Sequence, residues 1–212
     1  MKNQDYLYLD HAASTPMRKS AMDKYIEAES YGYANSSGGH KLSRNSKNLL
    51  EDSREKIAEL LNAAQGEIVF TSGGTEADNW TIKSLFNSER PNDNLVTSNI
   101  EHEAVIASAE WVSSNGFHTK YAKSDKNGLV TKDEFLGQVD NDTKVASLMW
   151  GNNETGIIQP IKDIAREIKT INSSTLFHSD VVQGIISDNI DFHRNGIESA
   201  AISAHKLSLI HI

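Results

Sequence analysis

A histidine–lysine pair stands near the end of the sequence, in the stretch Ala200-Ala201-Ile202-Ser203-Ala204-His205-Lys206. The small and apolar residues before the pair are typical of a strand, so we expect Lys206 to follow a strand end. A lysine at such a place is most often a solvated surface residue. If it is enclosed, its amine can lose its proton and form a Schiff base with an aldehyde.

A glycine-rich turn, Ser72-Gly73-Gly74-Thr75-Glu76, precedes a predicted helix. The free N–H groups of a helix start, close to Gly74 and the Thr75 hydroxyl, could bind a phosphate. An ordinary strand-to-helix turn with a threonine cap is the alternative, and for such a turn alone it is the commoner one. The pattern is neither GxGxxG nor GxxxxGK[ST], so dinucleotide and P-loop sites are not supported.

The stretch Glu101-His102-Glu103-Ala104-Val105-Ile106 resembles half of a zinc-binding HExxH helix. Ile106 stands where the second histidine would be, so we predict no metal site. His102 could cap the helix. As a flat ring at the ligand-binding edge of a sheet, it could instead stack on a planar cofactor.

Two more polar groups follow predicted strands. Asn153 lies in Gly151-Asn152-Asn153-Glu154-Thr155-Gly156, which is typical of a loop with left-handed conformations. Its amide could also bind a phenolic oxygen or a carboxylate. Asp180 could cap the next helix, or it could pair with a protonated ring nitrogen and keep it protonated.

Together these features would supply a phosphate cradle, a stacking ring, an amide for a phenolic oxygen, an acid for a ring nitrogen and an imine-forming lysine. Pyridoxal 5′-phosphate (PLP) is the cofactor whose groups match this set. A protein that binds PLP orients it and tunes its capacity to accept electrons. The residues therefore predict a PLP site.

Alternating strands and helices must position these residues. We predict strands at 67–71, 94–98, 117–121, 144–150, 175–178 and 198–204. We predict helices from about 46 to 61, from 75 to about 87 and from 104 to about 114, another that begins at Pro160, and a turn at 125–128. This alternation predicts an α/β fold with a mostly parallel sheet, in which ligands bind beyond the carboxyl ends of the strands.

The composition limits the kinds of partner. The 212 residues are 38% hydrophobic and 24% charged, which is typical of a soluble globular protein. A net charge of −8 without a basic cluster argues against direct binding of nucleic acid. No apolar run approaches the length of a membrane span and the start does not resemble a signal peptide, so we expect a cytoplasmic protein. The sequence contains no cysteine, so it supplies neither a disulfide nor a thiol nucleophile.

The motifs YLDHAASTP, EIVFTSGGTEADN, IEHEAVI, NNETGIIQPI, HSDVVQ and SAHK occur in this order. Their order and spacing resemble those of the NifS/IscS-type cysteine desulfurases, within the class V aminotransferase family. The resemblance covers residues 6–206. It implies the PLP-dependent transferase type I fold, with a mixed, mostly parallel sheet flanked by helices and truncated after the strand that leads to the PLP lysine.

The resemblance also implies roles for single residues. Lys206 resembles the lysine that binds the cofactor aldehyde, Asp180 the acid at the ring nitrogen, and His102 the stacking ring that assists proton transfer. Asn153 and Gln183 resemble the contacts to the phenolic oxygen, and Asn153 also lies near the substrate carboxylate. The implied phosphate contacts are Gly74, Thr75, Ser203 and His205.

Such enzymes are homodimers that convert L-cysteine to L-alanine and pass the sulfur, as a persulfide, to iron–sulfur scaffolds or tRNA-thiolating enzymes. The resemblance also implies that residues 1–15 belong to a small domain and residues 16–206 to an incomplete large PLP-binding domain. We expect residues 207–212, LSLIHI, to be a non-native tail, because a transposon-end sequencing adapter encodes the same six residues.

The sequence departs from the family pattern at Ser43, where glycine is usual, at Trp150-Gly151 and at Val181-Val182. The family part that follows SAHK is absent. It carries the catalytic cysteine, the arginine for the substrate carboxylate and the partner subunit's phosphate contact. Two alternatives to a desulfurase remain open. They are another class V PLP enzyme, such as a selenocysteine lyase or an aminotransferase, and an inactive fragment.

Overall fold

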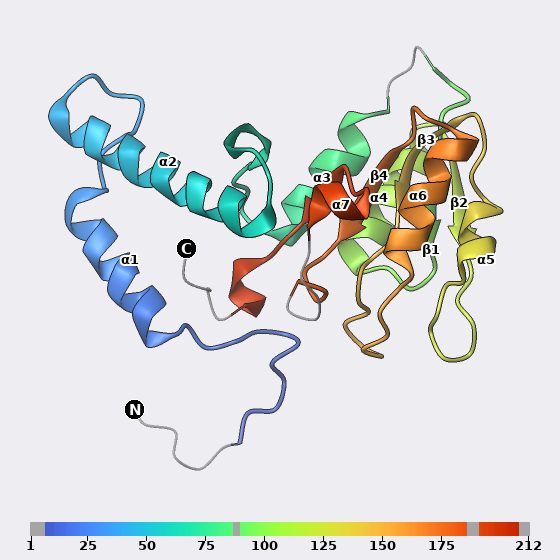
Figure 1. Cartoon of the computed structure of the whole chain (residues 1–212), viewed down its shortest axis with the longest axis horizontal. Coiled ribbons are helices and arrows are strands. Elements are labelled where there is room, and N and C mark those ends of the chain that lie inside the picture. Colours follow the sequence, from blue (N-terminus) through green and yellow to red (C-terminus); the bar gives the residue numbers. More distant parts are fainter. Residues whose placement is uncertain (1–6, 87–89, 186–190, 208–212) are drawn as a thin grey trace. The chain divides into compact units, whose positions relative to one another are not determined.

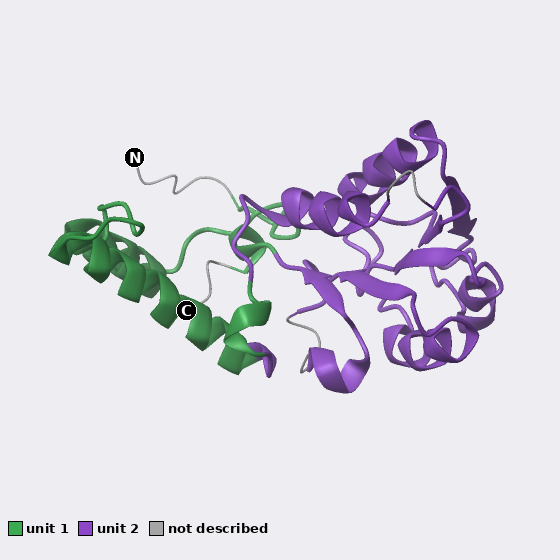
Figure 2. Cartoon of the chain, turned by 90° about the horizontal axis from the view of Figure 1, so that it is seen from above, with its two compact units in different colours: residues 1–60, 64–68, 203–212 green, residues 61–63, 69–202 purple. Residues whose placement is uncertain are grey.

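The computed structural model describes residues 7–86, 90–185 and 191–207. The chain forms two compact units, shown in different colours in Figure 2. Unit 1 consists of residues 1–60, 64–68 and 203–212, and unit 2 of residues 61–63 and 69–202.

Unit 2 contains a five-stranded sheet in the order β2-β1-β3-β4-β5 (Figure 1). The strands are β1 (Asn94–Ser98), β2 (His118–Ala122), β3 (Thr143–Ser147), β4 (Leu176–Asp180) and β5 (Ser199–Ala201). Every pairing between neighbouring strands is parallel. The predicted α/β fold with a mostly parallel sheet is thus confirmed, and the carboxyl ends of all five strands lie at one edge.

Helices cover both faces of this sheet. They are α3 (Gly74–Ser84), α4 (Glu103–Ser114), α5 (Lys132–Leu136), α6 (Ile161–Ile171) and α7 (Phe192–Asn195). Successive residues of a strand point to opposite faces. Accordingly, Leu95 packs in a buried cluster with residues of α3 and α4, and Val96 packs in a second cluster with residues of α5 and α6.

Helix α6 shows why these segments fold as they do. Its buried residues Ile161, Ile164, Ala165 and Ile168 recur at helical spacing and form one apolar stripe against the sheet. Pro160 occupies the N-cap position, one residue before the helix that we predicted it to begin. Most polar residues between the apolar ones are exposed, and Glu167 and Lys169 are half-buried.

The strand predicted at 67–71 is wrong. Residues 65–67 form a short 3-10 helix, η1 (Gln65–Glu67), and residues 68–71 are not in a strand. The run Ile68-Val69-Phe70 favours extended backbone, but a strand also needs a neighbour, and no described residue forms a ladder with it. The Val69 and Phe70 side chains are 57% and 44% exposed, so the segment is not buried either.

Other predicted boundaries shift by a few residues. The helix predicted from about residue 46 begins earlier, as α2 (Lys41–Leu61), and the helix predicted to reach residue 87 ends at Ser84. The strand predicted at 198–204 is only three residues long, and η2 (Ala204–Lys206) follows it. The strand predicted at 144–150 ends at Ser147, although the N–H groups of Leu148 and Trp150 still donate to β4 carbonyls. Residues 87 and 208–212 lie outside the described part.

Unit 1 contains α1 (Lys19–Tyr31), most of α2, η1 and η2. No residue of α1 is buried. Ser43, which departs from the family pattern, is fully buried at the start of α2, and its hydroxyl lies 3.1 Å from Nε2 of His40. This site thus accommodates a hydroxyl where glycine is usual. None of the described helices is long and apolar enough to cross a membrane.

Candidate functional site

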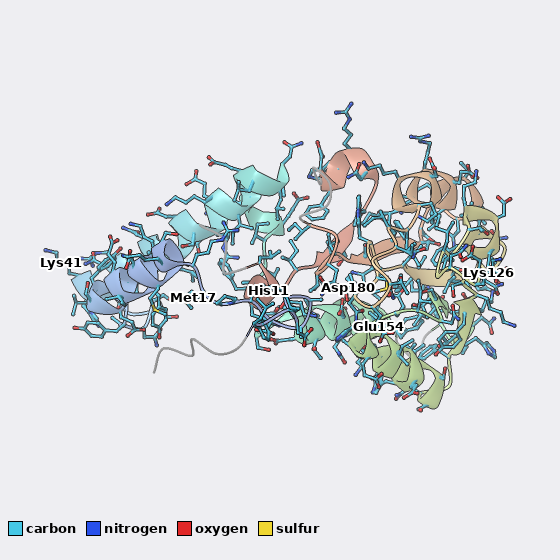
Figure 3. All side chains as sticks on the ribbon, turned by 90° about the horizontal axis from the view of Figure 1, so that it is seen from below. His11, Met17, Lys41, Lys126, Glu154 and Asp180 are labelled. Atoms are coloured by element: carbon cyan, nitrogen blue, oxygen red, sulfur yellow. The ribbon has the colours of Figure 1, made fainter. Side chains whose placement is uncertain are left out.

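Asp180 is the last residue of β4, at the edge of the sheet where the carboxyl ends of the strands lie (Figure 3). Its side chain is buried, and one carboxylate oxygen, Oδ1, accepts a hydrogen bond of 2.9 Å from the N–H of Val182. Burial raises the pKa of Asp180 to about 6, and the charge of Asp78 adds to this rise. The hydrogen bond from Val182 and the electrostatic effects of His178 and His102 partly oppose it. Asp180 is therefore a buried acid that still ionises near neutral pH.

A buried polar network, which was not predicted from the sequence, connects β4 to α3. Nε2 of His178 lies 3.0 Å from Oδ1 of Asp78, and both side chains are almost completely inaccessible to solvent. Nδ1 of His178 lies 3.1 Å from the Ser199 hydroxyl, which lies 2.8 Å from that of Thr81. The signal was present in the sequence, because residues two apart on a strand share a face and His178 precedes Asp180 by two.

Glu101 is a second buried acid that the sequence analysis did not single out. Its Oε1 accepts hydrogen bonds of 2.7 Å from the Ser98 hydroxyl and 3.0 Å from the N–H of Met149. Its Oε2 is buried and has no hydrogen-bond partner among the described residues. Burial raises the pKa of Glu101 to about 8, and the nearby acids Asp180 and Asp78 add to this effect against the two hydrogen bonds.

His102 is the N-cap of α4, and its Nδ1 accepts a hydrogen bond of 3.2 Å from the N–H of Ala104. Because Nδ1 accepts, the proton of the neutral ring lies on Nε2. The capping role that we considered for His102 is confirmed. That role also fixes the ring just beyond the carboxyl end of β1, since β1 ends at Ser98.

Helix α3 begins at Gly74, and its N-cap, Gly73, offers no side-chain hydrogen bond. Thr75 is therefore inside the helix and exposed, and the threonine cap that we considered is wrong. A Cβ built on Gly73 would meet no atom within 4 Å, so the backbone here is open to approach. The Glu76 carboxylate accepts a hydrogen bond of 2.5 Å from the N–H of Ser72.

The two asparagines after β3 differ in their surroundings. Asn152 is buried, donates to the Ile100 carbonyl at 2.9 Å and accepts from the N–H groups of Glu154 and Thr155, so it holds the loop in place. Asn153 is half-buried, and its side chain makes no hydrogen bond to another described residue. Asn153 is thus the asparagine whose amide is left for other contacts.

Gln183 is half-buried in the turn that follows β4. The next residue, Gly184, is buried, and a Cβ there would lie 2.3 Å from the Trp150 side chain. The close approach to Trp150 explains why a glycine stands after Gln183. Val182, with which the sequence departs from the family pattern, is buried in the same turn.

Ser203, His205 and Lys206 belong to unit 1, at η2. The buried Ser203 hydroxyl lies 2.8 Å from Nδ1 of His205. Thr15 donates to the His205 carbonyl through its N–H at 3.1 Å and its hydroxyl at 2.7 Å. Lys206 is half-buried. Of the predicted site residues, the structure thus groups these three in one unit, and Gly74, Thr75, His102, Asn153, Asp180 and Gln183 in the other.

Comparison with known proteins finds relatives that are named cysteine desulfurases. Cysteine desulfurase IscS of Methanosarcina thermophila is 37% identical over 201 residues, which are 94% of this chain and 49% of the relative. The putative cysteine desulfurase IscS 1 of Bacillus subtilis is 36% identical, over 95% of this chain and 53% of the relative. The chain therefore spans about half the length of the curated relatives that it matches.

Solved structures are also similar to this chain. A NifS-like protein superposes with a TM-score of 0.91 at 34% identity, over 95% of this chain and 56% of the other. A structure of SspA in complex with cysteine superposes with a TM-score of 0.89 at 32% identity, over 96% of this chain and 58% of the other. The model of the family "Aminotransferase class-V" matches residues 7–208. The chain therefore belongs to the class V aminotransferase family.

Proposed function

We propose that this chain is the cofactor-binding part of a PLP-dependent cysteine desulfurase, which converts L-cysteine to L-alanine and transfers the sulfur as an enzyme persulfide. The similarity to the IscS proteins and to the SspA structure with cysteine supports the substrate. The observation that carries the proposal is the buried Asp180 at the carboxyl end of β4, in the same unit as the open N-terminus of α3.

The donor set fits this cofactor. At neutral pH a carboxyl whose pKa is about 6 is mostly ionised, so Asp180 offers a buried negative charge to a protonated ring nitrogen. The N-terminus of α3 presents N–H groups, and its N-cap, Gly73, has no side chain to cap them, which suits the phosphate of the same cofactor. Opposite charges are thus available for the two ends of the PLP molecule.

A bound PLP would supply a ring that takes up the electrons of the breaking substrate bond. Asp180 would hold the proton on the ring nitrogen, and His102 would stack on the ring and move a proton at Nε2. Lys206 would provide the amine that binds the cofactor. The remaining proposed contacts are Asn153 and Gln183 to the phenolic oxygen, and Gly74, Thr75, Ser203 and His205 to the phosphate.

The proposal extends to assembly and partners. We infer a homodimer, a cytoplasmic location, and an iron–sulfur scaffold or a tRNA-thiolating enzyme as the sulfur acceptor. Exposed apolar side chains on α1 and α2 support an interface in unit 1; they are Met22, Tyr25, Ile26, Leu42, Leu50 and Leu60. We also propose that residues 1–15 join a small domain and that residues 16–206 are part of the large one.

The test uses the full-length protein loaded with PLP. Borohydride reduction should attach the cofactor permanently to the wild-type protein and to Lys126→Ala, because Lys126 is an exposed lysine in the 125–128 turn. Lys206→Ala should show no such adduct by mass spectrometry. An adduct in Lys206→Ala would contradict the assignment of Lys206.

A product assay separates the desulfurase from other members of the family. Alanine and sulfide should form from L-cysteine in equal amounts, in the presence of a reductant. Turnover of selenocysteine without turnover of cysteine, or formation of a keto acid from an amino-acid donor, would contradict the proposed reaction.

A further inference from the structure

Three buried acids, Asp78, Glu101 and Asp180, interact electrostatically in unit 2, and they are 1%, 9% and 6% exposed. Asp78 pairs with His178, and Asp180 accepts from the N–H of Val182. Glu101 differs from both. Its Oε1 accepts two hydrogen bonds, whereas its Oε2 is buried without a partner among the described residues.

The unpaired oxygen decides the charge of Glu101. Ionisation of a carboxyl that has one buried, unpaired oxygen carries a large desolvation cost. The protonated carboxyl avoids this cost because it has no charge. Both donors reach Oε1, so the proton of the neutral form lies on Oε2. The surroundings of Glu101 favour its protonated form. Its electrostatic neighbours Asp180 and Asp78 are acids, and its hydrogen-bond donors Ser98 and Met149 are neutral.

The imidazoles in this region do not change this balance. His178 is hydrogen-bonded to Asp78 and Ser199, and His102 is the neighbour in sequence that caps α4 through Nδ1. Both histidines lower the pKa of Asp180, whereas the pKa of Glu101 is set by burial, its two hydrogen bonds and the two acids. The two histidines therefore favour ionisation of Asp180.

We propose that Glu101 is a positioning residue of the candidate site, a neutral acid that ties the end of β1 to the segment after β3 and leaves Asp180 as the ionised partner of the ring nitrogen. The protonation of Glu101 stands on its own contacts. Its effect on a bound cofactor rests on the proposed function.

The direction of the pH effect follows from the charges. In the folded protein the pKa of Glu101 is about 8, so the carboxyl keeps its proton at neutral pH and loses it in alkaline solution. Ionisation would place a second negative charge near Asp180. Two nearby acids are coupled, so removal of the Asp180 charge should make the ionisation of Glu101 easier.

Infrared difference spectroscopy of the full-length protein without cofactor tests the protonation. With ¹³C-labelled glutamate, a protonated-carboxyl band should be present at neutral pH and disappear with a midpoint near pH 8. Glu101→Gln should lack the band, because Gln is isosteric and uncharged. Glu103→Gln, at an exposed position two residues further on, should retain it. A labelled band that is absent at neutral pH in the wild type, or that persists in Glu101→Gln, would overturn the proposal.

A second variant tests the coupling, which a merely structural role would not affect. In Asp180→Asn the midpoint of the Glu101 band should fall, since one neighbouring anion is removed. An unchanged midpoint would overturn the positioning role even if the protonation is confirmed. With PLP bound, the wild-type absorption spectrum should change near the same midpoint and Glu101→Gln should not show that change. A protein that shows the infrared band but binds no PLP would contradict the proposed function and not the protonation of Glu101.

Discussion

At the scale of single residues, the surroundings of a carboxyl decide what it can do. Asp180 and Glu101 are both buried, but their pKa values are raised to about 6 and about 8. Each of them receives a backbone hydrogen bond and lies near another acid. Two histidines favour ionisation of Asp180, whereas one oxygen of Glu101 has no hydrogen-bond partner among the described residues. At neutral pH one of them is mostly charged and the other mostly neutral.

The role of Asp180 leads to the first prediction. In the full-length protein, Asp180→Asn should retain PLP but lower kcat by about two to four orders of magnitude, because the charge that holds the ring proton is lost. Absorbance of the bound cofactor and the initial rate of alanine formation measure the two effects. Near-normal turnover in Asp180→Asn would remove Asp180 from this role.

The types of the site residues were readable from the sequence, but their surroundings were not. Asp180, His102 and the SGGT turn stood out because each follows a predicted strand or precedes a predicted helix. The Asp78–His178 pair was missed because its members are 100 residues apart and meet only in the folded sheet. Glu101 was examined only as part of a failed zinc motif, since its burial depends on Ser98 and on the segment after β3.

At the scale of elements, local pattern predicted the strands that are buried on both sides. β1, with every residue buried, was predicted at its observed bounds. The segment 67–71 has similar apolar residues, but no strand of the described residues pairs with it. Strand β5 is shortened because the chain turns into η2 after Ala201. Whether an apolar segment forms a strand, and how long that strand is, therefore depends on pairing partners far away in the sequence and not on periodicity alone.

Helix α3 is tied to β4 and β5 by the network of Asp78, His178 and Ser199. Asp78→Ala should lower the free energy of unfolding by about 1–3 kcal/mol, because it leaves the buried Nε2 of His178 without its partner. Urea unfolding measures the change. The control is Asp52→Ala, an exposed acid on α2, which should change stability by less than about 0.5 kcal/mol. Equal effects of the two substitutions would show that the buried network does not stabilise α3.

The turn after β4 is equally constrained. Gly184→Ala would place a methyl group 2.3 Å from Trp150, so the indole or the turn must move. Overpacking of this kind costs about 1–3 kcal/mol. Thermal unfolding should show a lower Tm for Gly184→Ala than for Gly66→Ala, since a Cβ at Gly66 would meet no atom within 4 Å. A Tm that is equal in both variants would contradict the close contact.

At the scale of the whole molecule, stability depends on pH through the acids whose pKa changes on folding. An acid whose pKa is lowered and one whose pKa is raised contribute with opposite sign. Partial burial raises the pKa of Asp140, but hydrogen bonds from Lys120, Asn94 and Thr143 outweigh it and lower the pKa to about 2. The unfolded value is about 3.9, so the stabilisation by Asp140 is fully present above that pH and is lost as the pH falls towards 2.

Asp140→Asn should therefore weaken the fall in stability in this acid range. Chemical unfolding at a series of pH values measures it, with Asp163→Asn, at an exposed position of α6, as the control. A wild-type slope in Asp140→Asn between about pH 4 and pH 2 would show that these hydrogen bonds do not favour the ionised form.

The last prediction concerns the chemistry of the chain as a whole. Desulfuration by the proposed reaction needs a thiolate that takes up the sulfur, and the 212 residues contain no cysteine. Residues 1–206, expressed with and without 207–212 and supplied with PLP, should therefore form no protein persulfide from L-cysteine, whereas the full-length protein should form one. Mass spectrometry and an alanine assay measure both products. Persulfide on the cysteine-free chain, with alanine in equal amount, would contradict the requirement for a thiolate and with it the proposed mechanism of sulfur transfer.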